Sequence, residues 1–131
     1  MQTIPDFFEQ SVKNFSNNIY MLEKNGNSYT GTSYIETRKQ VSLLAAGLMA
    51  MGLKKGERVA LLSEGRNAWV ISELAILYCG AVNVPMSVKL AEPEEIRFRI
   101  SHSGAKMVIV SERQAEKVNG LHMLGFLISW F

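Results

Sequence analysis

Three short runs of consecutive apolar residues, separated by longer segments of helical character, organise the hydrophobic pattern of the chain. The runs are Val59–Leu62, Ala81–Val84 and Met107–Val110. Strands of a parallel sheet are covered on both faces, so they read as continuous apolar runs instead of alternating ones. The pattern therefore predicts three parallel strands in one sheet, joined by right-handed helical crossovers.

The segment between the first two runs is predicted to be a helix that is buried on more than one side. It follows a polar turn at Ser63–Arg66 and spans about a dozen residues. Gly80 comes after it, where a left-handed residue would end a helix. Almost no polar face remains, because a helix with so many apolar positions packs inside a layered protein. These positions are Trp69, Val70, Ile71, Leu74, Ala75, Ile76 and Leu77.

Upstream of this unit, the pattern predicts a helix followed by a hairpin. The helix runs from Thr3 to Phe15, with Pro5 in its first turn. The strands Ile19–Leu22 and Ser28–Thr30 flank a turn at Asn25-Gly26-Asn27. One face of the helix carries Phe8, Val12 and Phe15.

A second amphipathic helix connects the hairpin to the central unit. It begins at a capping box, Ser33–Glu36, in which the Ser hydroxyl and the Glu carboxylate each bind an amide of the first turn. Gly52 ends it, and Leu53 can make the apolar contact of a Schellman cap. Its predicted buried stripe is Val41, Leu44, Leu48 and Met51.

Downstream, a loop at Met86–Ala91 leads to a helix that begins at Pro93 and ends at Ser103-Gly104. After the third apolar run, a second capping box at Ser111–Gln114 predicts a short helix. Helices that alternate with buried strands indicate an α/β fold with three layers, in which helices flank a mainly parallel sheet.

The last eleven residues, Leu121–Phe131, carry no charge and show no periodicity. A C-terminal strand would alternate or lie between turn signals. We therefore expect a domain over residues 1–120 and an apolar tail over 121–131 that does not continue the fold, as a frameshift or a premature stop would produce. Deleting the tail is expected to leave folding stability nearly unchanged and to improve solubility.

Composition excludes several classes of function. The net charge is only +2, and the basic residues are scattered, which gives nucleic-acid binding little support. No apolar run approaches the roughly 20 residues of a membrane span. The N-terminus lacks the pattern of a signal peptide, so we expect a cytoplasmic location. The single cysteine, Cys79, falls in the buried helix and is interpreted as a core residue.

One turn is a candidate binding site. Ser63–Asn67 lies between the end of a parallel strand and the start of a helix, where free amides attract anions. Its other interpretation is a structural turn with Asn67 as the helix N-cap. Tyr29–Ser33 is similar to a phosphate loop in composition, but we interpret it as the end of the hairpin and the cap of the next helix.

The remaining polar residues predict no catalytic or metal site. His102 and His122 have no cysteine or acidic residue at a metal-ligand spacing. The acidic cluster in the predicted first turn of the third helix is explained by the helix dipole instead of acid–base catalysis. Its members are Glu92, Glu94 and Glu95.

The order of these elements resembles the N-terminal part of the AMP-forming acyl-adenylate ligases, and most closely the long-chain fatty acid–CoA ligases. The resemblance covers about residues 3 to 119. The matching pieces are Ser33-Tyr34-Ile35-Glu36, Ala45-Ala46-Gly47-Leu48, Gly52 to Val59, Leu77 to Pro85, Glu95-Ile96 and Ser103-Gly104-Ala105-Lys106. The turn residues Ser63-Glu64, Arg66 and Trp69 look like those of the long-chain subgroup.

The resemblance implies a parent reaction with ATP, Mg²⁺ and coenzyme A. A carboxylate attacks the α-phosphate of ATP to give an acyl-adenylate and pyrophosphate, and coenzyme A then displaces AMP as a thioester. The family's phosphate loop, nucleotide contacts and catalytic lysine lie beyond the matching region. No catalytic, cofactor-binding or metal-binding residue is therefore carried over to this chain, and no cofactor is expected for it alone.

Two main hypotheses remain open from the sequence. The chain is an inactive N-terminal fragment of a fatty acid–CoA ligase, or it is a small α/β module that binds a nucleotide or a protein at the Ser63–Asn67 turn. A third hypothesis is an interaction fragment whose apolar tail docks on another chain. Because the rest of the parent sheet is absent from these residues, exposed apolar surface and self-association are expected.

Overall fold

The computed structural model describes residues 2–119 and 126–129. Its centre is a four-stranded sheet in the order β4-β3-β5-β6, in which every neighbouring pair is parallel. The three strands expected from the apolar runs are present and parallel, so this prediction is confirmed. The strands are β3 (Arg58–Leu62), β4 (Val82–Met86), β5 (Ala105–Val110) and β6 (Phe126–Ser129).

Strand β4 continues one residue beyond its expected loop boundary, through Pro85 to Met86. It is an edge strand of the described sheet, which explains why it tolerates a proline. The amide of Val82 faces β3, where it donates to the Glu57 carbonyl at 2.8 Å. Backbone groups alternate in direction along a strand, so Pro85 faces away from β3 and its missing N–H removes no hydrogen bond to that strand.

Strand β6 is an element that the hydrophobic pattern did not predict. It pairs in parallel with β5, with Met107 opposite Phe126 and Val110 opposite Ser129. The expected tail thus contributes a strand to the sheet, although its other residues lie outside the described part of the chain. A domain boundary at residue 120 stays a prediction.

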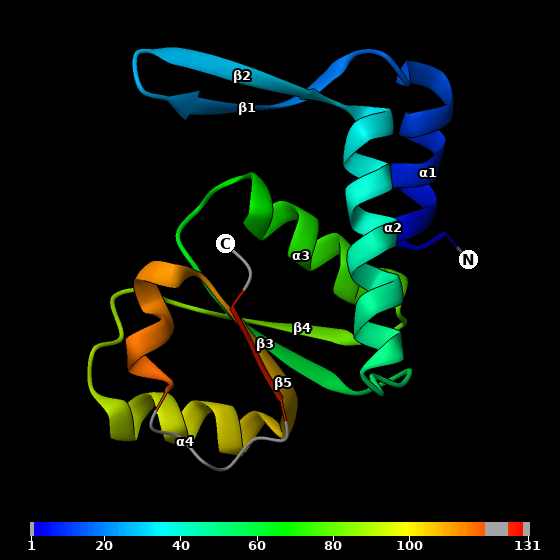
Figure 1. Ribbon diagram of the computed structural model, residues 1–131. Coiled ribbons are helices and arrows are strands. Elements are labelled where there is room, and N and C mark those ends of the chain that lie inside the picture. Colours follow the sequence, from blue (N-terminus) through cyan, green and yellow to red (C-terminus); the bar gives the residue numbers. More distant parts are fainter. Residues whose placement is uncertain (1, 120–125, 130–131) are drawn as a thin grey trace.

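Helices cover both faces of the sheet and produce the expected three layers (Figure 1). Val59 and Leu61 of β3 pack in one apolar core with helices α1 (Ile4–Phe15), α2 (Tyr34–Ala50) and α3 (Asn67–Tyr78). Ala60 and Leu62 point to the opposite face, where they pack with α4 (Pro93–Ser103). This alternation follows from the pleat of the strand, in which successive side chains lie on opposite faces.

Helix α3 is the buried helix that the sequence predicts, since no residue from Asn67 to Cys79 is classed as exposed. Gly80 follows it with φ +69°, a left-handed conformation that suits glycine. The prediction of Asn67 as N-cap is wrong. The cap residue is Arg66, whose side chain makes no capping hydrogen bond, and Asn67 is the first residue inside the helix.

Helix α2 ends in the expected Schellman motif. The amide of Leu53 donates to the Leu48 carbonyl at 3.1 Å, and the amide of Gly52 donates to the Met49 carbonyl at 3.0 Å. The predicted stripe was partly wrong, because Met51 is the C-cap and is 37% exposed. The buried positions follow the 3.6-residue period and are Thr37, Val41, Ala45 and Leu48.

The N-terminal helix and hairpin are also present. Strand β1 (Ile19–Asn25) and strand β2 (Ser28–Ser33) are antiparallel and longer than expected. In α1, Phe8 and Val12 are buried, but Phe15 is 50% exposed at the end of the helix.

One polar cluster ties the three helices on this side of the sheet together. Glu9 of α1 accepts hydrogen bonds from Arg38 of α2 at 2.8 Å and from Tyr78 of α3 at 2.6 Å. Burial raises the pKa of Tyr78, and the Glu9 carboxylate raises it further, so the phenol stays protonated and remains a donor. Within residues 2–119 and 126–129, no helix combines the length and apolar character needed to span a membrane.

Candidate functional site

The carboxyl ends of β3 and β5 form a topological switch point. These strands are neighbours in the sheet. After β3 the chain enters α3 on one face, and after β5 it enters the short 3-10 helix η1 (Glu112–Lys117), whose following residue Val118 packs in the core on the other face. Open α/β sheets bind ligands in the crevice that such diverging connections leave.

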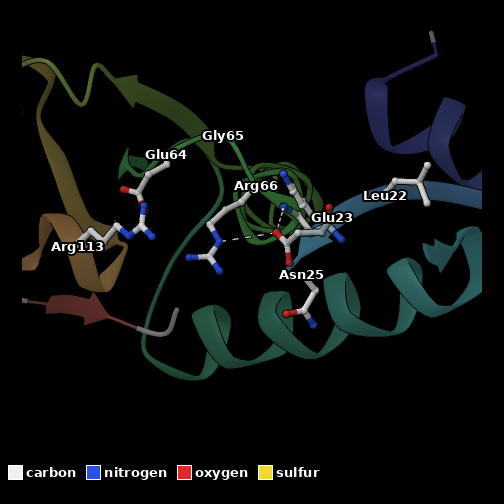
Figure 2. A pocket seen from close by; sticks show the side chains of 9 residues that line it. Leu22, Glu23, Asn25, Glu64, Gly65, Arg66 and Arg113 are labelled. Atoms are coloured by element: carbon white, nitrogen blue, oxygen red, sulfur yellow. Dashed lines mark hydrogen bonds and ion pairs between the residues drawn. The ribbon is translucent and has the colours of Figure 1, made fainter. Parts of the chain in front are cut away.

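A cleft of about 600 Å³ lies at this position (Figure 2). The loop after β3 forms one wall and the end of hairpin β1–β2 forms the other, with Arg113 from the segment after β5. The lining residues of the cleft are Leu22, Glu23, Lys24, Asn25, Glu64, Gly65, Arg66, Asn67 and Arg113. Four of the five residues of the predicted turn Ser63–Asn67 therefore line the largest described cleft.

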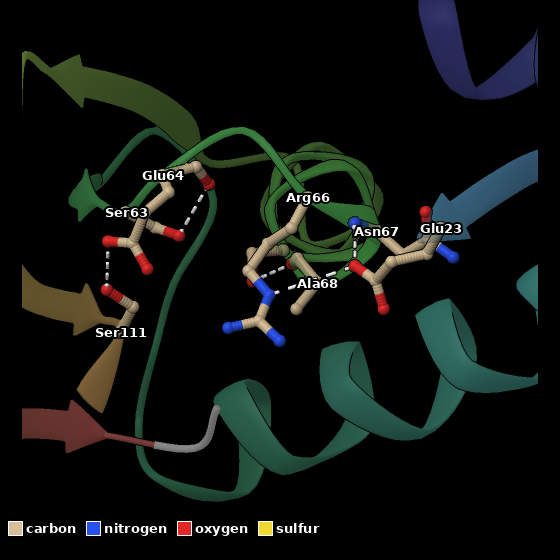
Figure 3. Close-up of polar contacts among 8 residues, drawn as sticks. Glu23, Ser63, Glu64, Arg66, Asn67, Ala68 and Ser111 are labelled. Carbon is tan, nitrogen blue, oxygen red and sulfur yellow. Dashed lines mark hydrogen bonds and ion pairs between the residues drawn. The ribbon is translucent and has the colours of Figure 1, made fainter. Parts of the chain in front are cut away.

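Glu64 is held in place by residues that follow β5 (Figure 3). Its Oε2 atom accepts a hydrogen bond from Ser111 Oγ at 2.8 Å and another from Gln114 Nε2 at 3.0 Å. The Ser63 hydroxyl donates to the backbone carbonyl of Glu64 at 2.8 Å. These contacts join the ends of two neighbouring strands and fix the orientation of the carboxylate.

Opposing influences act on the pKa of Glu64. Burial raises it, but the hydrogen bonds from Ser111, from the backbone and from Gln114, together with the nearby charge of Arg113, outweigh burial and lower it below its usual value. The carboxylate is therefore ionised at neutral pH. Its second oxygen, Oε1, is buried and has no hydrogen-bond partner among the described residues.

The predicted capping box at Ser111–Gln114 is wrong. Ser111 makes no side-chain cap for η1, and both polar side chains of the box bind Glu64 instead. The amide of Ser111 also donates to the Leu62 carbonyl at 3.1 Å, which continues the pairing of β5 with β3 by one residue. Ser111 is fully buried, so its hydroxyl needs a partner, and the Glu64 carboxylate is a stronger acceptor than a neutral group.

The N-terminus of α3 is occupied by a carboxylate of the protein itself. Glu23 Oε1 of β1 accepts a hydrogen bond from the Asn67 amide at 3.0 Å and lies 3.8 Å from Arg66 Nε (Figure 3). A helix N-terminus attracts an anion through its free amides and its dipole. Because Glu23 supplies that anion, the feature that suggested phosphate binding at Ser63–Asn67 is already used within the fold.

The other candidate residues have structural roles where the structure describes them. Ser33 ends β2 and accepts a hydrogen bond from the Glu36 amide at 3.2 Å, as expected for the cap of α2. His102 stacks on Phe98 with ring centroids 5.4 Å apart, whereas His122 lies outside the described residues. In the acidic cluster, Glu95 pairs with Arg99 at 2.9 Å.

Cys79 follows α3 and is half-buried. Its thiol donates to the Ala45 carbonyl of α2 at 3.4 Å, and burial raises the pKa of the thiol. A raised pKa disfavours the nucleophilic thiolate, in agreement with a packing role. Across the described part of the chain, no cluster of three His, Cys, Asp or Glu side chains could hold a metal ion.

Comparison with protein families gives a match to the AMP-binding enzyme family over residues 8–125. The chain belongs to the AMP-binding enzyme family. The match confirms the predicted resemblance to the acyl-adenylate ligases and extends it a few residues beyond the expected limit at residue 119. It also shows that the residues around the switch point belong to the conserved frame of an AMP-binding enzyme.

Curated relatives of this AMP-binding chain include ligases for different acids. It is 36% identical to a feruloyl-CoA synthase from Amycolatopsis sp. over 92 residues, which cover 70% of this chain and 18% of that enzyme. It is 34% identical to the long-chain-fatty-acid–CoA ligase FadD15 from Mycobacterium tuberculosis over 77 residues, which cover 59% of this chain and 13% of that enzyme. The chain thus spans less than a fifth of the length of these relatives.

Solved structures confirm the α/β fold. The N-terminal domain of FACL13 from Mycobacterium tuberculosis superposes with a TM-score of 0.90 at 24% identity, and the match covers 99% of this chain and 34% of that domain. The NpsA N-terminal subdomain from Klebsiella oxytoca gives a TM-score of 0.83 at 26% identity over 98% of this chain and 31% of that subdomain. The three-layer arrangement is therefore the arrangement of AMP-binding N-terminal domains.

Proposed function

We propose that this chain is the N-terminal part of a ligase that activates a long-chain fatty acid with ATP and transfers the acyl group to coenzyme A. The family match over residues 8–125 carries the proposal, since it places almost the whole chain in the AMP-binding enzyme family. FadD15 and a long-chain-fatty-acid–acyl-carrier-protein ligase from Arabidopsis thaliana are among the relatives. ATP, Mg²⁺, coenzyme A and the fatty acid are the cofactors and substrates proposed for the complete enzyme, in the cytoplasm.

The switch-point cleft does not fit the triphosphate of ATP. Two carboxylates, Glu23 and Glu64, line it, and Glu23 takes the Asn67 amide that an anion would use. A phosphate placed there would displace one carboxylate and lie close to the other. The structure therefore supports a scaffolding role for this part of the ligase, in which its residues shape the domain and do not contact the reacting phosphates.

The 131-residue chain alone is expected to show no fatty acid-dependent ATP–pyrophosphate exchange. Adenylate formation needs groups that stabilise the charge of the phosphates in the transition state, and the described cleft supplies none that is free of carboxylates. The measurement is exchange of labelled pyrophosphate into ATP with octanoate, laurate and palmitate. Exchange above the no-acid background with any of these acids would contradict the inactive-fragment hypothesis.

A second candidate function is a nucleotide- or protein-binding module, which the volume of the cleft favours. Calorimetric titration of the same chain with ATP and Mg²⁺ separates the two. A scaffold should give no binding at micromolar ATP, whereas a nucleotide module should bind. If binding is found and is lost in an Arg113→Ala variant but retained in a Lys39→Ala variant on α2, the module is the better assignment.

Replacing the matching segment of FadD15 with this chain tests both the fold and the proposed acid. We expect the chimera to retain palmitate-dependent exchange within about tenfold of FadD15, because scaffold substitutions that keep the backbone in place change transition-state energies by about 1.4 kcal/mol or less. The equivalent chimera of the Amycolatopsis feruloyl-CoA synthase serves as the matched comparison, with ferulate as the acid.

The relative retention of activity decides between the two acids. The long-chain proposal predicts that a larger share of activity survives in the FadD15 chimera than in the feruloyl-CoA synthase chimera. The reverse order would assign the chain to an aromatic-acid ligase. Loss of exchange in both chimeras, with circular dichroism showing both to be folded, would contradict a ligase scaffold altogether.

A further inference from the structure

The outer face of hairpin β1–β2 exposes three large apolar side chains. Ile19, Leu22 and Tyr29 are 56%, 65% and 66% exposed. The hairpin extends away from α1 and α2, and α3 lies between it and the four-stranded sheet (Figure 1). We refer to these three side chains as the outer hairpin face.

The inner face of the same hairpin is already used. Met21 is buried in the core with α1, α2 and α3, and Glu23 binds the Asn67 amide. Side chains alternate along a strand, so Leu22 points away from these contacts. In the register of the hairpin, Leu22 lies opposite Gly31, and Lys24 lies opposite Tyr29.

Gly31 joins the outer hairpin face into a continuous surface. A Cβ atom at Gly31 would lie 2.9 Å from Ile19 Cδ1 and 3.2 Å from Ile19 Cγ2. Cross-strand partners share a face, so the Ile19 side chain lies across the bare backbone of Gly31, beside Leu22. Lys24 adds a charge beside Tyr29, at the turn end of the surface, which gives it an apolar centre and a polar rim.

A surface of this kind is covered in a complete protein. Exposed apolar groups that gather on one face mark interaction sites, and a two-stranded hairpin needs a further strand or packing surface for stability. The inner side of the hairpin has its packing partner. The outer side has none among residues 2–119 and 126–129.

The comparisons indicate what covers it. This chain, with its hairpin, superposes on the FACL13 N-terminal domain over 99% of its own length but on only 34% of that domain. The proportions for the NpsA subdomain are 98% and 31%. In both domains, about two-thirds of the residues therefore belong to segments that this chain does not match and that fold with the matched third.

We propose that the outer hairpin face is the surface on which the unmatched two-thirds of an AMP-binding N-terminal domain packs. The inference rests on the proposed function, because it takes this chain to be interchangeable with the matched third of such a domain. The occupant is an apolar protein surface and not a small molecule, since the three side chains lie on an open strand face outside the lining of every described cleft except for Leu22 at the margin of one.

The test compares one substitution in two settings. Leu22→Lys is made in the 131-residue chain and in a chimera in which this chain replaces the matched third of the FACL13 N-terminal domain. In the short chain Leu22 is exposed, so the midpoint of thermal unfolding should shift by less than about 2 °C. In the chimera the lysine would be buried in an apolar contact, and the midpoint should fall by about 4 °C or more.

Leu43→Lys is the matched control, because Leu43 is 75% exposed on α2, away from the hairpin. It should leave both midpoints within about 2 °C. Tyr29→Lys is a second variant, expected to behave as Leu22→Lys does. A Leu22→Lys effect that is equal in the two settings, or no larger than that of Leu43→Lys in the chimera, would overturn the proposal.

Two further outcomes also decide. A chimera that is insoluble without any substitution would count against the proposal, because it would show that this chain does not supply the surface that the domain needs. Stability is read without substrate, so the result is independent of which acid the ligase activates. A folded, Leu22-sensitive chimera that lacks exchange activity would support the docking surface and contradict the proposed function.

Discussion

The Leu61→Ala variant is expected to lose about 2–5 kcal/mol of the free energy of unfolding. Leu61 lies in β3, which has β4 on one side and β5 on the other, and its side chain is fully buried in the core shared with α1, α2 and α3. Removing three heavy atoms there takes away their burial energy and leaves a cavity that a packed sheet cannot close. Urea unfolding followed by circular dichroism measures the loss.

Leu43→Ala makes the same chemical change at a residue that is 75% exposed on α2. It should alter the free energy of unfolding by no more than about 0.5 kcal/mol. Equal losses in the two variants would show that β3 is not the centre of the core. A loss below about 1 kcal/mol for Leu61→Ala would contradict the burial of its side chain.

The Ser111→Ala variant should lose about 1–3 kcal/mol at neutral pH, because it removes a donor from a partly buried carboxylate. Ser111 is fully buried, and its hydroxyl donates to Glu64 at 2.8 Å. The remaining donor to the same oxygen is Gln114 at 3.0 Å. Glu64 would thus keep its charge and lose a hydrogen bond that no water is placed to replace.

The pH dependence distinguishes this contact from simple packing. The pKa of Glu64 is lower in the folded chain than its ordinary value of 4.5, so the contribution of Glu64 to stability is complete above that value. It is lost as the pH falls through the folded pKa. The Ser111→Ala defect should therefore be largest near pH 7 and shrink below about pH 4.

Urea unfolding at pH 7, 5 and 3.5 measures the effect. Ser42→Ala, at an exposed position on α2, is the control and should be neutral or slightly stabilising at each pH, since alanine favours helices. A Ser111→Ala defect that does not change with pH would show that the hydroxyl contributes only through packing. In that case the Glu64 carboxylate would not be the group that it stabilises.

The parallel sheet could be predicted from sequence because its signal is local. Val59–Leu62 is an unbroken apolar run, and only strands covered on both faces tolerate such a run. The end of α2 was predictable for the same reason, since Gly52 and Leu53 define the Schellman motif by themselves.

The polar site could not be predicted because its partners are distant in sequence. Glu64 and Ser111 are 47 residues apart, and Glu23 and Asn67 are 44 apart. Spacing carries no information at that range without the sheet order. Ser111 and Gln114 also have the spacing of a capping box, and this pattern is the same whether the side chains bind the local backbone or a carboxylate on another strand.

Two misplaced boundaries have physical explanations as well. Pro85 was taken as the end of a strand, but an edge strand accepts proline where the missing N–H faces away from its neighbour. Strand β6 gives no periodic signal because four residues at the end of a parallel sheet need neither alternation nor caps. Such a strand is recognised through its pairing with β5.

The order β4-β3-β5 also determines how the chain reaches its folded state. Hairpin β1–β2 closes through a short turn, an event of about 1–10 μs. No pair in the main sheet can close in this way, because each parallel pair is separated by a crossover, and β3 meets β5 only after α3, β4 and α4 have been passed. Loop closure of that length slows folding. During synthesis, β3 therefore carries an unpaired apolar edge until β5 has emerged, and this interval is when the chain is most exposed to aggregation.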